Sequence, residues 1–460
     1  MVLLTTLSLS LLALIPTVLG EIEPLKARTH QIHPYHTRAP KIRTDSANVN
    51  GTHTKRAPAL RFPYGSTKVR GVNLGGWLVL EPWITPSLFD NTGNAKIVDE
   101  YTFGQYQDYN TAQNKLKAHW DSWVIESDFA AIAAAGLNHV RIPIGYWAFD
   151  ISGGEPYHQG QYPYLLKAIQ WAQKYGIKVL VDLHGAPGSQ NGFDNSGRRG
   201  SATWHTNSQN VARTNAIIKT LATEFSKDQY ASTVTSIAPL NEPAGFVGGN
   251  VMDVIRQYWY DSYGNIRYPF GSSTQGPLLE VIHDAFQSLS SWNGFMKYPN
   301  YEGVAMDTHH YEVFSDAEVA MTWPQHLQTA CNFGINTVGS YSSNNIWTFV
   351  GEWTTAPYDC AKYLNGRGVG ARYDGTYPGS TKRGDCSPFT GSRTKFSTDY
   401  KNFMRQFYEA QTSSFERGGQ GWFYWTWKAE QADEWSYQAG LAGGWIPTNP
   451  TERKYPNVCG

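Results

Sequence analysis

The stretch SIAPLNEP (residues 236–243) is a mostly apolar run that ends in an amide, a carboxylate and a proline. Proline has a fixed φ angle and no backbone N–H, so the run is predicted to be a strand at Ser236–Leu240 that stops at the residues before the proline. A second carboxylate, Glu352, stands in the same setting 110 positions after Glu242, at the end of the apolar run WTFVG. The sequence therefore predicts two glutamates at strand ends.

Short runs rich in Val and Ile alternate with longer helical patterns from residue 69 onward, which is typical of repeated βα units. Strands are predicted at Val69–Leu74, Asn138–Ile142, Lys178–Leu183, Ser236–Leu240, Leu279–His283, Val304–His309, Thr348–Gly351 and Gly421–Trp427. Helices are predicted at Trp120–Ala134, Tyr162–Tyr175, Val211–Phe225, Val251–Tyr260 and Thr398–Ala410, and a long loop at residues 356–397. Eight units favour an α/β fold, a single (β/α)₈ TIM barrel with enlarged loops at the C-terminal face of the strands. A doubly wound sheet is the rival, but no Gly-x-Gly-x-x-Gly turn follows the first strand.

The first 56 residues are predicted to be absent from the mature protein. Residues 1–20 resemble a secretory signal peptide, with an apolar stretch and small residues before a cleavage point, although they contain no Lys or Arg. A membrane anchor is the alternative, but the apolar run is short for a span. Residues 21–56 are poor in apolar side chains and are predicted to be a disordered pro-segment that ends at the dibasic pair Lys55-Arg56. Residues 57–460 then form the catalytic domain.

The charge balance argues against nucleic acid as a partner. The chain has 38 basic and 38 acidic side chains, and its net charge at neutral pH is close to zero, with no basic run in residues 57–460. The glycosylation sequon Asn50-Gly51-Thr52 lies in the segment expected to be removed. We expect a secreted protein, extracellular or in the cell wall, that has no membrane contact in its mature form and is a monomer.

Four cysteines, Cys331, Cys360, Cys386 and Cys459, lie in the last third of the chain. Their even number fits an oxidising compartment, and three disulfide pairings are open from the sequence. A metal cluster is not expected, because no Cys-x-x-Cys or close Cys/His spacing occurs.

Polar side chains collect where the predicted strands end, which is the catalytic face of a (β/α)₈ barrel. Paired carboxylates at that face are typical of enzymes that cleave sugar bonds. The candidates are Glu81, Arg141, Asp182, His184, Asn241, Glu242, His309, His310, Tyr311, Glu352 and the stretch Trp425-Thr426-Trp427-Lys428. Alternation along a strand assigns the site role to His309 and turns His310 to the other face.

These stretches resemble the fungal secreted exo-β-1,3-glucanases of glycoside hydrolase family five. The most specific are RGVNLGGW with LEPW (residues 70–77 and 80–83) and DLHGAPGSQNG (residues 182–192). LNEP, HHY, GEW and WTWK follow in the family's order (residues 240–243, 309–311, 351–353 and 425–428). The resemblance covers nearly all of residues 57–460.

The resemblance implies a retaining mechanism without metal or organic cofactor, with Glu242 as acid/base and Glu352 as nucleophile. Asn241 is expected to bind the sugar 2-OH, and Arg141 to keep Glu352 ionised and oriented. His184, His309 and Tyr311 are expected to line the first sugar subsite, and Glu81 to bind hydroxyls at its closed end.

The resemblance also assigns roles to aromatic residues and cysteines. Trp427 is expected to be the platform under the cleaved sugar, with Trp425 as the alternative. Phe193 and Phe314 match a pair that flanks the exit subsites. The implied disulfides are Cys331–Cys459 and Cys360–Cys386.

The expected substrate is thus β-1,3-glucan, as polysaccharide or oligosaccharide, from which glucose is released at non-reducing ends in cell-wall glucan metabolism. Two alternatives remain open at this stage. An endo-acting or β-1,6-glucanase would share the fold, because loop geometry decides between pocket and groove. A catalytically inactive glucan-binding barrel is the second alternative, although both glutamates and their Asn and Arg partners are present.

Overall fold

The computed structural model describes residues 59–271 and 273–460. The expected signal peptide, pro-segment, dibasic site and sequon lie outside the described residues.

Eight parallel strands close into a barrel in the order of the chain, with β1 paired to β8. This confirms the predicted (β/α)₈ fold. The strands are β1 (Val69–Asn73), β2 (His139–Gly145), β3 (Lys178–Gly185), β4 (Val234–Ala238), β5 (Leu279–His283), β6 (Val304–His309), β7 (Trp347–Glu352) and β8 (Gly421–Tyr424).

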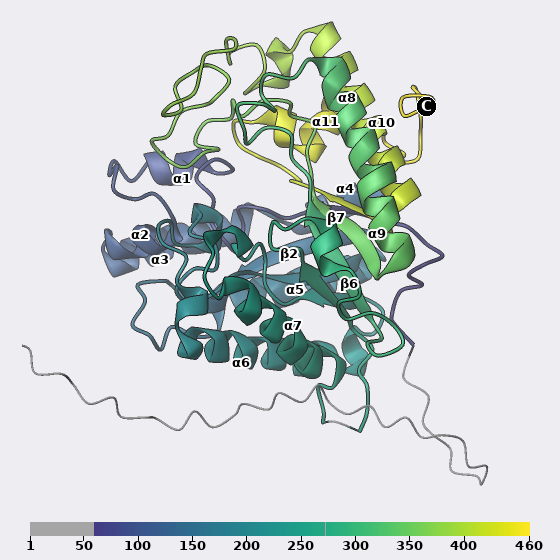
Figure 1. The fold of residues 1–460 in the computed structure, drawn as a ribbon. Helices are drawn as coiled ribbons and strands as arrows, with labels where there is room; N and C mark the ends of the chain where they lie inside the picture. The colour runs from purple at the N-terminus through teal and green to yellow at the C-terminus, as the bar shows by residue number, and fades with distance from the viewer. Residues whose placement is uncertain (1–58, 272) are drawn as a thin grey trace, which may run out of the picture. The chain divides into compact units, whose positions relative to one another are not determined.

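Eleven α-helices occur in the described residues, and the longer ones surround the barrel (Figure 1). They are α1 (Pro86–Asp90), α2 (Glu100–Gln105), α3 (Tyr109–Ser122), α4 (Glu126–Ala134), α5 (Gln161–Lys174), α6 (Ser208–Phe225), α7 (Val251–Arg267), α8 (Trp323–Asn332), α9 (Gly339–Asn344), α10 (Thr398–Gly418) and α11 (Tyr437–Gly443). A π-helix, Phe333–Val338, joins α8 to α9. Short 3₁₀ turns occur in the loops, among them Asp194–Ser196, Gly245–Val247 and Leu289–Trp292.

The prediction of one helix at Trp120–Ala134 was wrong, because α3 ends at Ser122 and α4 begins at Glu126. The side chain of Asp128 accepts a hydrogen bond from the backbone N–H of Ile125, which starts a new helix. The helical segments between β6 and β7 were missed. β8 is also shorter than predicted, since it ends at Tyr424.

The barrel interior changes from apolar to polar along the strands. On β3 the alternate residues Leu180, Asp182 and His184 form one row, and Leu180 belongs to the apolar cluster with Val281 of β5 and Phe349 of β7. The adjoining polar residues of the row, Asp182 and His184, are both buried. The strand pattern therefore gives an apolar core at one end of the barrel and a charged floor at the other.

Both implied disulfides are present, with Cα–Cα distances of 5.4 Å for Cys331–Cys459 and 5.2 Å for Cys360–Cys386. The second disulfide closes the long loop at residues 356–397, which contacts α1 through an ion pair between Lys362 and Asp90. Within the described part of the chain, every helix is too short or too polar to cross a bilayer.

Candidate active site

A cavity of about 530 Å³ opens at the carboxyl ends of the strands and is lined by Glu81, Trp83, Gly192, Phe193, Asp194, Asn195, Arg199, Glu242, Phe286, His309, Tyr311, Phe314, Glu352, Leu364, Asn365, Gly366, Arg372, Tyr377, Trp425 and Trp435. Seven residues expected in the site line it: Glu81, Phe193, Glu242, His309, Tyr311, Phe314 and Glu352. Arg141, His184 and Asn241 are buried, but they are not part of the lining. They lie behind the carboxylates and hold the floor in place.

Glu352 reaches the cavity through an irregularity in the sheet. His309 of β6 pairs with Glu352 of β7, whereas the preceding residue Thr308 pairs with Val350, so Gly351 is left unpaired. A Cβ atom on Gly351 would lie 2.0 Å from the Asp307 carboxylate, so only glycine fits there. Bulges of this kind often redirect side chains next to active sites.

Two donors fix the Glu352 carboxylate. Arg141 Nη1 donates to Oε1 at 2.8 Å and the Tyr311 hydroxyl donates to Oε2 at 2.9 Å. Arg141 Nη2 also donates to Asn241 Oδ1 at 2.7 Å, and Asn73 accepts a further hydrogen bond from Nη1 at 3.0 Å. The expected placement of Arg141 beside Glu352 is confirmed, and Asn241 is bound to that arginine.

Glu242 is held by its backbone and by His309. Its φ angle is +46°, a conformation that non-glycine residues rarely adopt. The side-chain amide of Gln190 donates to the carbonyl of Asn241 at 2.9 Å, and the N–H of Ala244 donates to the carbonyl of Gln190 at 3.0 Å. These contacts bracket Glu242 on both sides and maintain its strained backbone.

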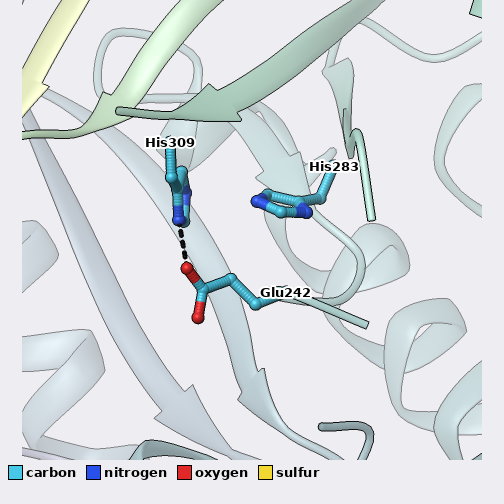
Figure 2. A group of neighbouring side chains, drawn as sticks. All are labelled: Glu242, His283 and His309. Carbon is cyan, nitrogen blue, oxygen red and sulfur yellow. Dashed lines mark hydrogen bonds and ion pairs between the residues drawn. The ribbon is translucent and has the colours of Figure 1, made fainter. Parts of the chain in front are cut away.

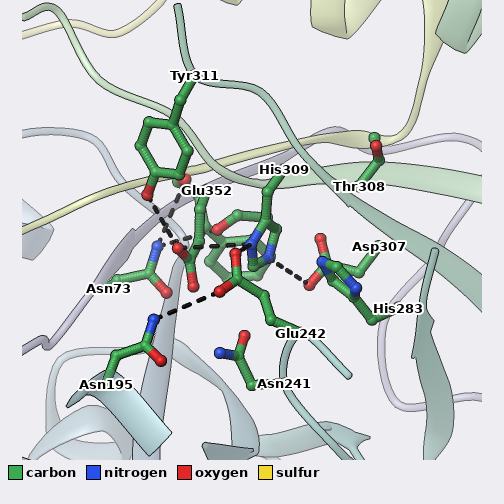
Figure 3. A network of polar contacts seen from close by, with 12 residues as sticks. Asn73, Asn195, Asn241, Glu242, His283, Asp307, Thr308, His309, Tyr311 and Glu352 are labelled. Carbon is green, nitrogen blue, oxygen red and sulfur yellow. Dashed lines mark hydrogen bonds and ion pairs between the residues drawn. The ribbon is translucent and has the colours of Figure 1, made fainter. Parts of the chain in front are cut away.

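His309 lies between the two glutamates (Figure 3). Its Nδ1 is 2.6 Å from Glu242 Oε1 and 3.5 Å from Glu352 Oε2, and its Nε2 is 3.4 Å from Asp307. The Asn195 amide donates to the other Glu242 oxygen at 3.4 Å. One imidazole therefore couples both carboxylates.

The electrostatics of this group differ from the expectation. Burial acts to raise the pKa of Glu242, but the hydrogen bond and charge of His309 outweigh it and the pKa is lowered. Burial raises the pKa of Glu352 despite the opposing charges of His309 and Arg141. Burial acts to lower the pKa of His309, but the charges of Glu352 and Asp307 raise this pKa well above its usual value. These directions favour a charged His309 imidazole beside an ionised Glu242.

Glu242, His283 and His309 form the only group in residues 59–271 and 273–460 whose spacing would suit a metal (Figure 2). However, Nδ1 of His283 accepts a hydrogen bond from the N–H of Ala285 at 3.0 Å. This neutral tautomer carries its proton on Nε2, so neither ring nitrogen offers a free lone pair to an ion. The hydrogen bond that His283 accepts from the backbone thus competes with metal binding at this group.

Glu81 closes one side of the cavity. Its Oε2 accepts a hydrogen bond from Trp83 Nε1 at 3.0 Å, and its Oε1 is buried without a partner in the described part of the chain. Burial, with the charges of Asp194 and Glu352, raises the pKa of Glu81 well above its usual value. A buried carboxylate oxygen without a protein partner is rare in a folded protein, which favours a role for Glu81 in ligand binding.

The expectation that Trp427 is the sugar platform was wrong, because Trp425 lines the cavity and Trp427 does not. Trp427 is fully buried and donates through Nε1 to Asp128 at 2.9 Å. β8 ends at Tyr424, so strand alternation no longer applies to these two residues. Trp425 stacks on His184 with ring centroids 5.5 Å apart, which explains why His184 lies behind the cavity.

Three exposed aromatic side chains form what we call the aromatic rim: Phe193, Phe286 and Phe314, each 41% exposed. Phe193 and Phe314 were expected at the site, whereas Phe286 was missed. Other missed lining residues, Asn195 and Tyr377 among them, lie in loops, where no periodic pattern marks a direction. Trp83 and Gly192 did have a sequence signal, because they lie in the stretches LEPW and DLHGAPGSQNG.

Known proteins resemble this chain over most of its length. The model of the family described as Cellulase (glycosyl hydrolase family 5) matches residues 99–366. A glucan 1,3-beta-glucosidase of Blumeria graminis is 47% identical over 87% of this chain and 92% of its own length. A probable glucan 1,3-beta-glucosidase A of Aspergillus niger is 48% identical over 86% of this chain and 92% of its own length. The crystal structure of rutinosidase from Aspergillus niger has the same fold, with a TM-score of 0.64 and 17% identity, over 85% of this chain and 100% of that one.

Proposed function

Because the chain belongs to glycosyl hydrolase family 5, we propose that it hydrolyses β-1,3-glucan, releasing glucose from non-reducing ends with retention of configuration. The observation that carries this proposal is the pair of buried glutamates on either side of His309. The distances from its Nδ1 to the two carboxylates, 2.6 Å and 3.5 Å, limit the separation of those two oxygens to about 6 Å. This limit favours a retaining pair, at about 5–5.5 Å, over an inverting one, at about 6.5–9.5 Å.

Glu352 is the nucleophile of the proposed mechanism. Arg141 and Tyr311 orient its two oxygens, so the carboxylate can attack the anomeric carbon while the glycosidic bond breaks. Positive charge that develops on the sugar favours the ionised form of Glu352, which offsets the effect of burial on its pKa. A covalent glycosyl-enzyme results.

Glu242 is the acid/base. In this mechanism His309 passes a proton across the 2.6 Å hydrogen bond to Glu242, which gives it to the departing glucan oxygen. In the second step Glu242 takes a proton from water, and the water oxygen displaces Glu352 from the anomeric carbon. The lowered pKa of Glu242 is therefore compatible with its role, provided that His309 supplies the proton.

Exo action is supported by the walls of the cavity. Glu81 and Trp83 lie on its lining together with Leu364 and Tyr377 of the disulfide-closed loop. We propose that these residues close the cavity beyond the first sugar. We also propose secretion and a monomeric state, and the two disulfides support passage through an oxidising compartment.

The test is an NMR spectrum of the first products that the purified protein releases from laminarin, recorded before mutarotation. β-Glucose as the sole early sugar is the expected result. α-Glucose would mean inversion and would contradict the two-glutamate mechanism. β-Configured oligosaccharides would keep the mechanism and show endo action, and release of sugar only from β-1,6-glucan would change the substrate.

A further inference from the structure

An apolar surface continues outward from the aromatic rim. Phe246, in the 3₁₀ turn Gly245–Val247 after β4, is 56% exposed and its neighbour Val247 is 45% exposed. Neither residue lines the cavity. We call Phe246 and Val247 the outer platform.

The rings of the rim connect this platform to the cavity. Phe246 lies 6.3 Å from Phe193, with the ring planes inclined by only 24°, and 5.5 Å from Phe286 in an edge arrangement. Phe193 and Phe286 are themselves 6.2 Å apart. Three rings from three different loops therefore form one continuous aromatic surface. Two of them, Phe193 and Phe286, line the cavity.

The protein holds Phe286 in this surface by an unusual backbone. Ala285 and Phe286 have φ angles of +56° and +58°. His283 accepts from the N–H of Ala285 at 3.0 Å, and Asp284 accepts from the N–H of Phe286 at 2.9 Å. A buried network thus determines where the middle ring of the surface stands.

The character of the surface indicates its ligand. Residues 245–250, GFVGGN, contain no charged side chain. A neutral ligand with flat C–H faces and hydroxyl edges fits exposed phenyl rings, because its faces bury apolar area while its hydroxyls stay in water. Glucosyl units of a neutral β-glucan have this chemistry.

We propose that Phe246 forms an outer subsite for glucosyl units of the leaving glucan, beyond those that contact Phe193. This inference rests on the proposed function, and it makes activity depend on chain length. A substrate too short to reach Phe246 gains nothing from the outer platform, whereas longer laminari-oligosaccharides bind more tightly.

The test measures kcat/KM of the wild type and of Phe246→Ala on an aryl β-glucoside and on the series from laminaribiose to laminarihexaose. The loss on laminarihexaose is expected to exceed the loss on the aryl glucoside by about fivefold, mainly through KM. Phe246→Tyr is expected to retain the wild-type ratio, whereas Phe246→Leu loses it because the flat face is removed. Phe270→Ala is the matched control, since Phe270 is also exposed (62%) and does not line the cavity.

Equal losses at every chain length would overturn the outer subsite while leaving glucan hydrolysis intact. The outer subsite would also be overturned if Phe246→Ala had the kinetics of the wild type but lost self-association in sedimentation. The outer platform would then bind a second copy of the chain. If the wild-type protein cleaves no laminari-oligosaccharide, the proposed function itself fails.

Discussion

The floor of the cavity and its aromatic rim are opposite in physical character. On the floor, charged groups such as Arg141 and Glu352 are buried and hold one another through hydrogen bonds of 2.6–3.0 Å. At the rim, phenyl rings are 41% exposed. The floor is organised before substrate arrives, so its contribution appears in the chemical step. The rim gains free energy only when a sugar covers it, so its contribution should appear in binding and depend on chain length.

The largest effect is expected from the floor. Glu352→Gln removes the nucleophile but keeps the size of the side chain, so kcat on laminarin should fall on the order of 10⁴-fold or more, with laminarin still bound. Initial rates and binding calorimetry measure the two quantities. Glu280→Gln is the control, because Glu280 is a buried strand glutamate that bonds Ser262 on the outer side of the barrel. Activity of Glu352→Gln like that of the wild type would exclude Glu352 as nucleophile.

The second floor variant separates acid catalysis from nucleophilic attack. Glu242→Ala should slow laminarin hydrolysis about 100-fold more than hydrolysis of an aryl glucoside with a good leaving group, which needs little protonation. Rates on the two substrates give the ratio. Equal losses would remove Glu242 from the acid role.

A smaller effect is expected at the rim. Phe193→Ala removes apolar surface on the exit side, so kcat/KM for laminarin should fall about five- to tenfold more than that for an aryl glucoside. Comparison with Phe270→Ala controls for the loss of an exposed ring. A larger loss on the aryl glucoside would place Phe193 at the cleaved sugar and would break the division between floor and rim.

The smallest effect concerns Asp284, which joins the two regions. It accepts from the N–H of the rim residue Phe286 at 2.9 Å and from the hydroxyl of Thr308 on β6 at 2.6 Å. Burial, opposed by the hydrogen bond from Thr308, raises the pKa of Asp284 to about 7. The folded protein therefore holds a proton that the unfolded chain releases, and the free energy of unfolding falls as pH rises from about 4 to 7.

Asp284→Asn removes this dependence, so only the wild type should lose stability through this group as pH rises. The Tm of the variant relative to that of the wild type is expected to increase by about 2–4 °C between pH 4 and pH 8. Differential scanning calorimetry at several pH values measures the difference. Asp316→Asn, at an exposed position, is the control. A constant difference for Asp284→Asn across the range would show that the carboxyl is ionised throughout.

The same division describes what the sequence could predict. Much of the floor stands on strands, whose alternation orders its side chains, so His309 was distinguished correctly from His310, which lies near Glu312 instead. Glu242 lies four residues after the end of β4, and the stretch LNEP rather than alternation identified it. Prediction failed where regular structure ends. Trp427 was chosen over Trp425 because the end of β8 has no signal in its composition. The rim residue Phe286 was missed because loop backbone, with left-handed φ angles at non-glycine residues, follows no period.

The pairing of β1 with β8 has a consequence for biosynthesis. Val69 pairs with Gly421, so the sheet has two open edges until almost the whole chain has been made. At typical rates of about 5–20 residues per second, this delay is roughly 20–70 s. Strand edges exposed for that time are sites of aggregation. We therefore expect a message truncated before the codon for Gly421 to yield a chain prone to aggregation, even though Arg141 and both glutamates had already been translated.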